Sequence, residues 1–121
     1  MPLSPARAVV VVHFHNLLDA IAATPVMLEH LASAVELMDR FILDSTRGKT
    51  VYEPLREFMV GEPAAVLIVE LSERSPGDLP ARLDRLDADL RNRGIGYHFS
   101  RATSAPEQAR IWKLRRAALG L

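Results

Sequence analysis

Two long apolar runs, at residues 7–14 and 64–71, constrain the fold of this chain more than any other feature. The first is rich in valine and the second is apolar almost to its end, so both predict central or well-covered β-strands. Each run is followed by a helix-forming stretch and then by a shorter strand, which gives two strand–helix–strand units. We therefore expect an α+β fold, a ferredoxin-like sandwich whose four-stranded, mainly antiparallel sheet carries helices on one face.

The first unit is bounded by residues that cap or break helices. Asn16 is placed to cap a helix, and Thr24-Pro25 is expected to end it, because the residue before a proline avoids the helical region. A second strand is predicted over residues 32–37, followed by a helical stretch at residues 38–43. The first helix is expected to turn four apolar residues toward the core: Leu17, Leu18, Ile21 and Ala22.

The second unit contains the clearest helix of the chain. Asp78 is its expected N-cap and Gly94 its stop signal, and its leucines repeat on one face: Leu79, Leu83, Leu86 and Leu90. A fourth strand is predicted over residues 95–101. The connection at residues 44–63 is irregular in composition, and we expect one short helix in it with an apolar face formed by Leu55, Phe58 and Met59.

A closing helix is predicted near the end of the chain. Ser104 and Glu107 have the spacing of a capping box, and Pro106 falls in the first turn. Arg115 falls near the middle of the apolar arc of this helix, and a guanidinium that faces a core needs an anion, a group of carbonyls or water. The rest of the arc is Ile111, Leu114, Ala118 and Leu119, with Trp112 at its edge.

Periodicity alone leaves two interpretations of Arg115 open. Its stem can cover apolar surface while its head reaches solvent or the terminal carbonyls of a neighbouring helix. Alternatively, the guanidinium is a clamp for an organic acid, because its planar fork matches a carboxylate with two hydrogen bonds.

Composition and charge exclude several classes of function. The 121 residues suit a single domain over residues 1–121. The 15 basic and 15 acidic side chains cancel, so no global field indicates nucleic acid or an anionic membrane as a partner. The absence of cysteine excludes disulfides, thiolate nucleophiles and iron–sulfur ligands within these residues. The apolar runs, such as residues 8–12, are far too short to span a bilayer, and the start does not resemble a secretory signal, so we expect a cytoplasmic protein.

The histidines and carboxylates give no strong catalytic or metal signature. His13 and His15 would project from one face of a strand, a spacing that metal sites use, but no third ligand is evident and we expect solvated or hydrogen-bonded rings. His98 is a candidate for a polar pocket. Glu36 and Arg40 are placed to pair along a helix if the helix after the second strand begins early. Alternation of arginine with aspartate predicts a water-facing surface at Arg82, Arg85, Arg91 and Arg93.

Three segments, in this order, carry a resemblance to a known family. They are AVELMDR at residues 34–40, GEPAAVLIVEL at residues 61–71 and EQARIWKLRRAAL at residues 107–119. Together they resemble the C-terminal, substrate-side (cap) domain of FAD-linked oxidases of the vanillyl-alcohol oxidase superfamily. The glycolate oxidase and D-lactate dehydrogenase branch is most similar, especially its long fused forms that carry iron–sulfur motifs. The resemblance runs from about residue 5 to residue 121.

This resemblance implies a truncated piece of an FAD-dependent enzyme that oxidises a lactate-, glycolate- or hydroxyglutarate-like 2-hydroxy acid. A preceding FAD-binding domain would hold the flavin, so this piece alone would bind no cofactor and be inactive. In that family the arginine of a Trp-x-Leu-Arg segment binds the substrate carboxylate, and the matching residue here is Arg115. Relatives of the D-2-hydroxyglutarate type have a hydroxyl residue one turn later, where this chain has Leu119. The family's Glu-Asp pair and its histidine-containing metal and catalytic motif would lie beyond residue 121, so no catalytic, cofactor-binding or metal residue is assigned.

Two other interpretations are open at this point. A free-standing ferredoxin-like module that dimerises through its sheet and binds a small effector would explain a neutral, self-contained chain. Alternatively, Arg115 forms a salt bridge with a neighbouring domain, such as the FAD-binding domain, and binds no substrate. Gly120-Leu121 carries no stop signal, which favours a segment cut from a longer protein, and such a piece is expected to self-associate through surfaces that are normally covered.

Overall fold

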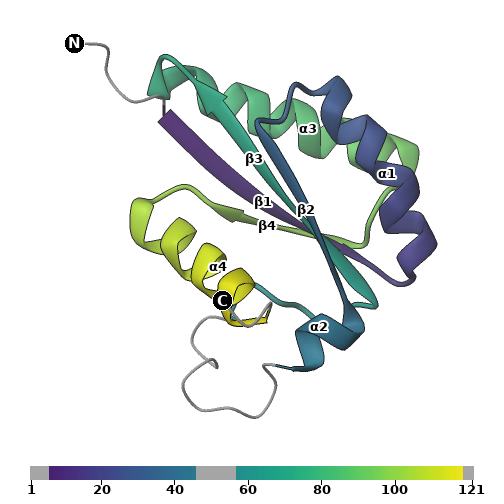
Figure 1. The fold of residues 1–121 in the computed structure, drawn as a ribbon. Helices are drawn as coiled ribbons and strands as arrows, with labels where there is room; N and C mark the ends of the chain where they lie inside the picture. Colours follow the sequence, from purple (N-terminus) through teal and green to yellow (C-terminus); the bar gives the residue numbers. More distant parts are fainter. Residues whose placement is uncertain (1–5, 46–56, 119–121) are drawn as a thin grey trace.

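A computed structural model of the chain describes residues 6–45 and 57–118. Strands and helices alternate in nearly the expected order (Figure 1). The expected short helix around Leu55 lies largely outside the described residues, and residues 57–63 contain none. No helix in the described ranges is long and apolar enough to cross a membrane. The elements are β1 (Ala6–Phe14), α1 (Leu17–Glu29), β2 (Ala34–Asp39), α2 (Arg40–Asp44), β3 (Ala65–Glu73), η2 (Pro76–Asp78), α3 (Leu79–Arg93), β4 (His98–Ala102) and α4 (Ala105–Ala118).

The four strands form one antiparallel sheet in the order β2-β3-β1-β4. β1 and β3 are central and pair along their full length, from Ala6 opposite Glu73 to Phe14 opposite Ala65. The shorter strands β2 and β4 lie at the two edges. The two apolar runs of the sequence thus become the strands that need both faces covered. The expected α+β class with a four-stranded antiparallel sheet is confirmed.

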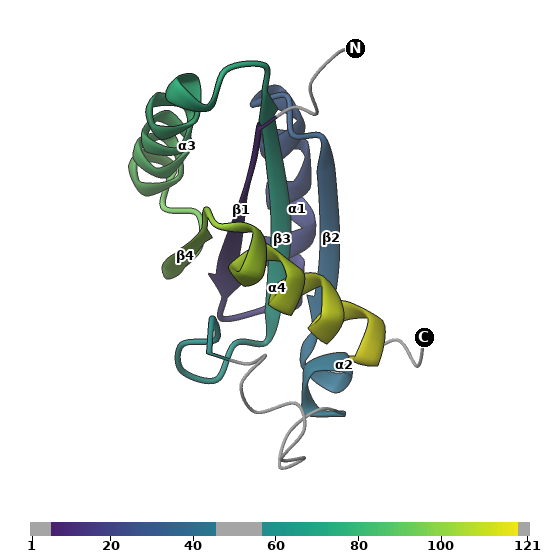
Figure 2. The same ribbon diagram turned by 90° about the vertical axis from the view of Figure 1, so that its left-hand side faces the viewer.

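Helices cover both faces of this sheet. The helices of the two strand–helix–strand units, α1 and α3, share one face as expected, and α4 lies on the opposite face (Figure 2). This division follows from the alternation of side chains along β1. Val10 and Val12 point toward α1 and α3, whereas Val9 and Val11 point toward α4. The chain therefore has two apolar cores, one on each face.

Helix α1 differs from expectation in its length and in the face that it buries. It continues through Pro25 to Glu29, because the proline deprives only the carbonyl of Ile21 of its helical donor, on the exposed side of the helix. The buried residues of α1 are Ala20, Ala23 and Met27. Small alanines let the helix approach the sheet closely, so the predicted core residues are wrong: Leu17, Leu18, Ile21 and Ala22 are all exposed.

The second strand and the helix after it begin two residues later than predicted. The Asp39 carboxylate accepts a hydrogen bond from the N–H of Ile42 at 2.9 Å, which fixes the start of α2 at Arg40. Glu36 therefore lies in a strand, and its predicted helical pairing with Arg40 is wrong. Arg40 Nη2 donates to the carbonyl of Glu62 at 3.1 Å instead.

Helix α3 matches its prediction closely. Its four leucines are buried, and it ends at Gly94, whose φ of 68° is the left-handed conformation of a helix stop. Asp78 precedes the helix, but its side chain makes no capping hydrogen bond. β4 begins at His98, three residues after the predicted start, because Gly96, with a φ of 74°, still belongs to the turn.

Candidate functional site

Helix α4 begins with the predicted capping box. Ser104 Oγ accepts from the N–H of Glu107 at 3.3 Å, and the Glu107 carboxylate accepts from the N–H of Ser104 at 3.1 Å. The side-chain hydrogen bond from Ser104, and after it the backbone bond, lower the pKa of Glu107. Gln108 Nε2 donates to the carbonyl of Arg7 at 2.8 Å, so the first turn of α4 is tied to β1. These contacts fix the direction in which α4 crosses the sheet.

The apolar arc of α4 rests on the sheet as predicted. Ile111 and Leu114 are buried, and Ile111 joins the core that contains Val9 and Val11. Trp112, at the edge of the arc, is partly buried against the same core. The other two predicted members, the side chain of Ala118 and the whole of Leu119, lie outside the described part of the chain.

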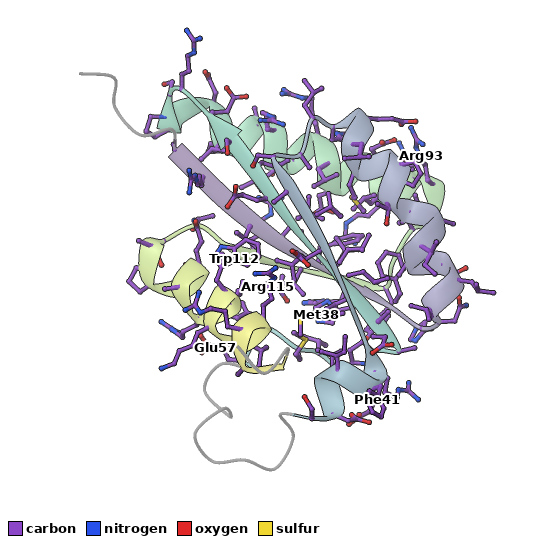
Figure 3. The ribbon with its side chains drawn as sticks, in the orientation of Figure 1. Met38, Phe41, Glu57, Arg93, Trp112 and Arg115 are labelled. Atoms are coloured by element: carbon purple, nitrogen blue, oxygen red, sulfur yellow. The ribbon has the colours of Figure 1, made fainter. Side chains whose placement is uncertain are left out.

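Arg115 lies in the last turn of α4, on the side of the helix that meets the sheet (Figure 3). Its Nη2 forms an ion pair with Oε1 of Glu36, and the two atoms lie 2.8 Å apart. Alternation along β2 places Glu36 on the same face as Met38, which is buried in the α4-side core. The Arg115 and Glu36 side chains are 31% and 36% exposed, so the ion pair lies at the border between core and solvent. The guanidinium therefore faces the sheet and has an anionic partner within the chain.

One donor of Arg115 is left over. Its Nε atom is buried and has no hydrogen-bond partner in the described part of the chain. A buried donor without an acceptor costs about 1–3 kcal/mol. The observed conformation thus leaves part of the hydrogen-bonding capacity of the guanidinium unused.

A second carboxylate on the same face is already bonded to hydroxyl groups. Glu70 pairs in register with Ala34 and Val9, which places its side chain on the α4 side of the sheet. Its Oε1 accepts a hydrogen bond from Ser33 Oγ at 2.8 Å. Glu70 is therefore held by serine, whereas Glu36 is held by arginine.

A groove lies at the end of α4 remote from Arg115. It has a volume of about 520 Å³, and Arg7, Leu79 and Gln108 are among its lining residues. Arg115, in the last turn of the helix, does not line this groove.

His13 is buried, and both of its ring nitrogens are in use. Nδ1 lies 3.1 Å from the carbonyl of Val11 and 3.2 Å from that of His98, so Nδ1 carries the proton and donates. Nε2 accepts from the N–H of Val60 at 3.1 Å. Burial, and after it the nearby His98 ring, lower the pKa of His13. The ring is therefore neutral at neutral pH, and it is hydrogen-bonded, as expected.

The other histidines of this region contact aromatic rings. His15 stacks on Tyr97 with ring centroids 4.1 Å apart, and the ring of His98 meets that of His13 edge-on at 5.1 Å. Across residues 6–45 and 57–118, no three His, Cys, Asp or Glu side chains are grouped so as to hold a metal ion. The rings of His13, His15, Tyr97 and His98 therefore pack in contact with one another near the end of β1.

Residues 58–60 are fastened to that end of the sheet by side chains that sequence analysis missed. Besides His13, Tyr97 donates through its hydroxyl to the carbonyl of Val60 at 2.6 Å, and Ser100 Oγ donates to the carbonyl of Phe58 at 2.8 Å. The acceptors are backbone atoms distant in the chain, so the contacts leave no pattern in the sequence.

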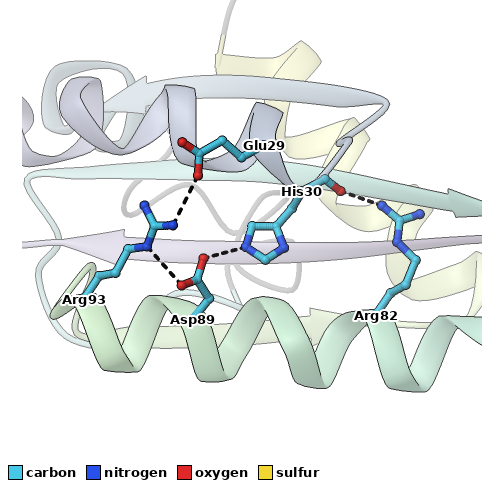
Figure 4. A network of polar contacts seen from close by, with 5 residues as sticks. All are labelled: Glu29, His30, Arg82, Asp89 and Arg93. Atoms are coloured by element: carbon cyan, nitrogen blue, oxygen red, sulfur yellow. Dashed lines mark hydrogen bonds and ion pairs between the residues drawn. The ribbon is translucent and has the colours of Figure 1, made fainter.

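A polar network joins α1 to α3 on the face away from Arg115 (Figure 4). His30 Nε2 lies 2.7 Å from the Asp89 carboxylate, to which Arg93 Nε also donates at 2.9 Å. Arg93 Nη2 reaches Glu29 at 3.2 Å. Arg82 donates to the carbonyl of His30 at 2.6 Å, and its side chain is only 12% exposed. The prediction that Arg82 faces water is therefore wrong, because its side chain is largely buried and links α3 to the end of α1.

The side chains on the α4 face are suited to binding a ligand rather than to proton transfer. Arg115 is permanently positive and can bind an anion, whereas His13 is neutral and its nitrogens are bonded. The core side chains between them are apolar. This face therefore places a permanently charged side chain at the edge of a buried apolar core, and substrate binding by Arg115 stays a prediction.

Residues 3–121 match the family model described as "FAD linked oxidases, C-terminal domain". The chain belongs to this family. This FAD-linked oxidase C-terminal domain is also 30% identical, over 131 residues, to a D-2-hydroxyglutarate dehydrogenase from Pantoea ananatis (strain AJ13355). The similarity covers 99% of the chain but only 13% of the length of that relative. The family suggested by the three sequence segments is confirmed.

Proposed function

We propose that this segment is the carboxylate-binding part of the substrate-side cap of a longer, FAD-dependent oxidoreductase that oxidises a 2-hydroxy acid. Family membership supports the FAD-linked chemistry, and the name of the Pantoea relative, D-2-hydroxyglutarate dehydrogenase, supports a hydroxy acid as substrate. The observation that carries the assignment to Arg115 is its ion pair with Glu36 on the sheet side of α4. A guanidinium that already holds one carboxylate is chemically suited to hold another.

We expect the flavin to be held outside this segment. The sequence lacks a glycine-rich phosphate loop. We therefore assign FAD to a preceding domain of the longer chain, where it would supply the hydride acceptor, and we expect this segment alone to be inactive. Any iron–sulfur cluster would need cysteines from elsewhere, because this segment has none. We propose a cytoplasmic location for the whole protein.

Arg115 would orient the acid. Two parallel hydrogen bonds from the guanidinium to the carboxylate restrict its rotation, which holds the α-carbon in one position relative to the hydride acceptor. This segment therefore contributes binding and orientation.

The alternatives have less support. Both faces of the sheet carry helices, so two copies pairing sheet to sheet would have to displace α4 or the pair of α1 and α3. A salt bridge from Arg115 to a neighbouring domain meets the same competition from Glu36 as a substrate carboxylate does, and only the substrate interpretation draws support from the name of the Pantoea relative.

The variant Arg115→Ala in the longer protein tests the proposal. We expect kcat/KM for the hydroxy acid to fall about 100-fold, equivalent to about 2.7 kcal/mol, with the flavin content unchanged. Arg115→Lys keeps the charge but loses the fork, so it should recover only part of the activity. Arg116→Ala removes the exposed neighbouring arginine and is the matched control. A value of kcat/KM for Arg115→Ala within about threefold of wild type would remove Arg115 from the binding site.

A further inference from the structure

Arg115 and Glu36 are brought together only by folding. Glu36 comes from the edge strand β2, and Arg115 comes from the last turn of α4. Their ion pair joins Nη2 of Arg115 to Oε1 of Glu36 at 2.8 Å. The carboxylate of Glu36 thus touches the outer end of the guanidinium.

This contact leaves the guanidinium incompletely satisfied. A carboxylate that binds arginine most strongly engages two of its N–H groups at once. Here Nε is buried without an acceptor in the described chain, so Glu36 does not provide a two-point contact through that edge. An acid that engaged two donors would hold Arg115 better than Glu36 does.

The exposure of the pair indicates how such an acid would arrive. Nε is closed to solvent, whereas the Arg115 side chain as a whole is 31% exposed. A carboxylate from solvent therefore meets the Nη end first, which is the end that Glu36 occupies. Binding with two hydrogen bonds requires Glu36 to give way or the guanidinium to turn.

We propose that Glu36 is a positioning residue that holds Arg115 in a waiting conformation and is exchanged for the substrate carboxylate. This inference rests on the proposed function of Arg115, and it adds that Glu36 competes with the substrate carboxylate for the guanidinium. Before substrate arrives, Glu36 neutralises the guanidinium and keeps it at the border of the core. During exchange the Glu36 carboxylate moves to solvent, to which 36% of its side chain already has access.

Removing the charge of Glu36 should therefore strengthen binding of the acid. In the longer, FAD-containing protein, we expect Glu36→Gln to lower KM about threefold or more, with kcat within about twofold of wild type. The substrate is whichever of lactate, glycolate and 2-hydroxyglutarate the wild-type protein turns over fastest. Glu36→Thr places a strand-forming residue in β2 and should change KM in the same direction, which guards against poor folding of one variant.

A merely structural role for Glu36 predicts a different result. It would lower the melting temperature of both variants and leave KM unchanged. Glu57→Gln is the matched control. It breaks the ion pair between Glu57 and Arg110, an arginine of the same helix as Arg115, and should not alter KM. In an Arg115→Ala background, Glu36→Gln should lose its effect on KM, because Glu36 then has no guanidinium to occupy.

The outcomes separate this inference from the proposed function. A loss of kcat/KM in Arg115→Ala together with a lower KM in the Glu36 variants supports both. If Arg115→Ala shows its loss but neither Glu36 variant lowers KM, the exchange is overturned while the clamp stands. If Arg115→Ala keeps wild-type kcat/KM, the clamp is overturned and the exchange falls with it.

Discussion

His13 and Arg115 lie on the same face of the sheet and compensate for burial in different ways. His13 gives up its charge, so the neutral ring is sealed in the core and bonded to backbone atoms at both nitrogens. Arg115 cannot lose its proton and therefore needs the carboxylate of Glu36. It also stays at the border of the core, where solvent reaches part of the side chain. The residue that can change its charge is the one that is fully enclosed.

The lowered pKa of His13 predicts that acid destabilises the fold. In the unfolded chain the ring takes up a proton near its ordinary pKa of 6.5, whereas in the folded chain it stays neutral to a lower pH. Between these two values the unfolded state binds more protons, so the free energy of unfolding falls as the pH falls below about 6.5. We expect the urea midpoint of the 121-residue chain to be lower at about pH 5.5 than at about pH 7.5.

Two variants test the assignment of this pH dependence. His13→Gln should reduce it, and at neutral pH should lower the free energy of unfolding by about 1–3 kcal/mol because the carbonyls of Val11 and His98 lose the ring Nδ1–H donor. His15→Gln changes an exposed histidine and should leave the pH dependence intact. Equal pH dependence in wild type and His13→Gln would assign the effect to another group.

At the scale of the elements, the turn between α3 and β4 contains two glycines with different surroundings. Both have positive φ, but a Cβ on Gly94 would meet nothing within 4 Å, whereas one on Gly96 would lie 2.8 Å from Val12 Cγ1 and 3.1 Å from the carbonyl of His13. Gly94→Ala should cost about 1–2 kcal/mol for the left-handed backbone. Gly96→Ala should cost about 1–3 kcal/mol more, because the added methyl overpacks the core.

Thermal or urea denaturation of the two glycine variants measures this difference. They share the backbone penalty, so the gap between them reports the space around Gly96. Equal destabilisation would show that Val12 and β1 adjust without cost.

The elements that the sequence predicts best are those in which apolar residues occupy one side only. In α3 the leucines form a single stripe among charged residues, so period and burial agree. In α1 apolar residues occur all round, and the pattern cannot show that the sheet accepts Ala20 and Ala23 while Leu18 faces outward. Close approach of helix to sheet decides that choice, and it is a tertiary property.

The sequence likewise predicts one part of the candidate site and misses another. The position of Arg115 on the sheet side of α4 follows from helical periodicity and from the capping box that starts the helix. Its partner Glu36 is not predictable, because it lies far away in the sequence and only folding brings β2 close to the last turn of α4. The buried Nε atom is likewise visible only in three dimensions.

At the scale of the whole molecule, α1 leaves an apolar stripe uncovered. Leu18, Ile21 and Leu28 are 76%, 50% and 57% exposed and fall on one side of the helix. Leu31, just beyond the helix, is 80% exposed. An exposed apolar stripe of this kind favours association. The 121-residue chain on its own is therefore expected to use this stripe to contact a second copy.

The double variant Leu18→Lys/Leu28→Lys tests that expectation. Sedimentation velocity over a range of concentrations should show association of the wild-type chain and a shift to monomer in the variant, because the added charges oppose burial of the stripe. Thr103→Lys adds a charge at an exposed position between β4 and α4 and should leave association unchanged. A wild-type chain that is monomeric at all concentrations would contradict the expectation.

The position of Arg82 has a consequence for how this domain tolerates change. It belongs to the contacts between α1 and α3 on one face of the sheet, while Arg115 and Glu36 lie on the other. The sheet thus separates the two groups of polar contacts. The α1 and α3 layer can be redesigned, for fusion or for greater robustness, without touching the proposed anchor.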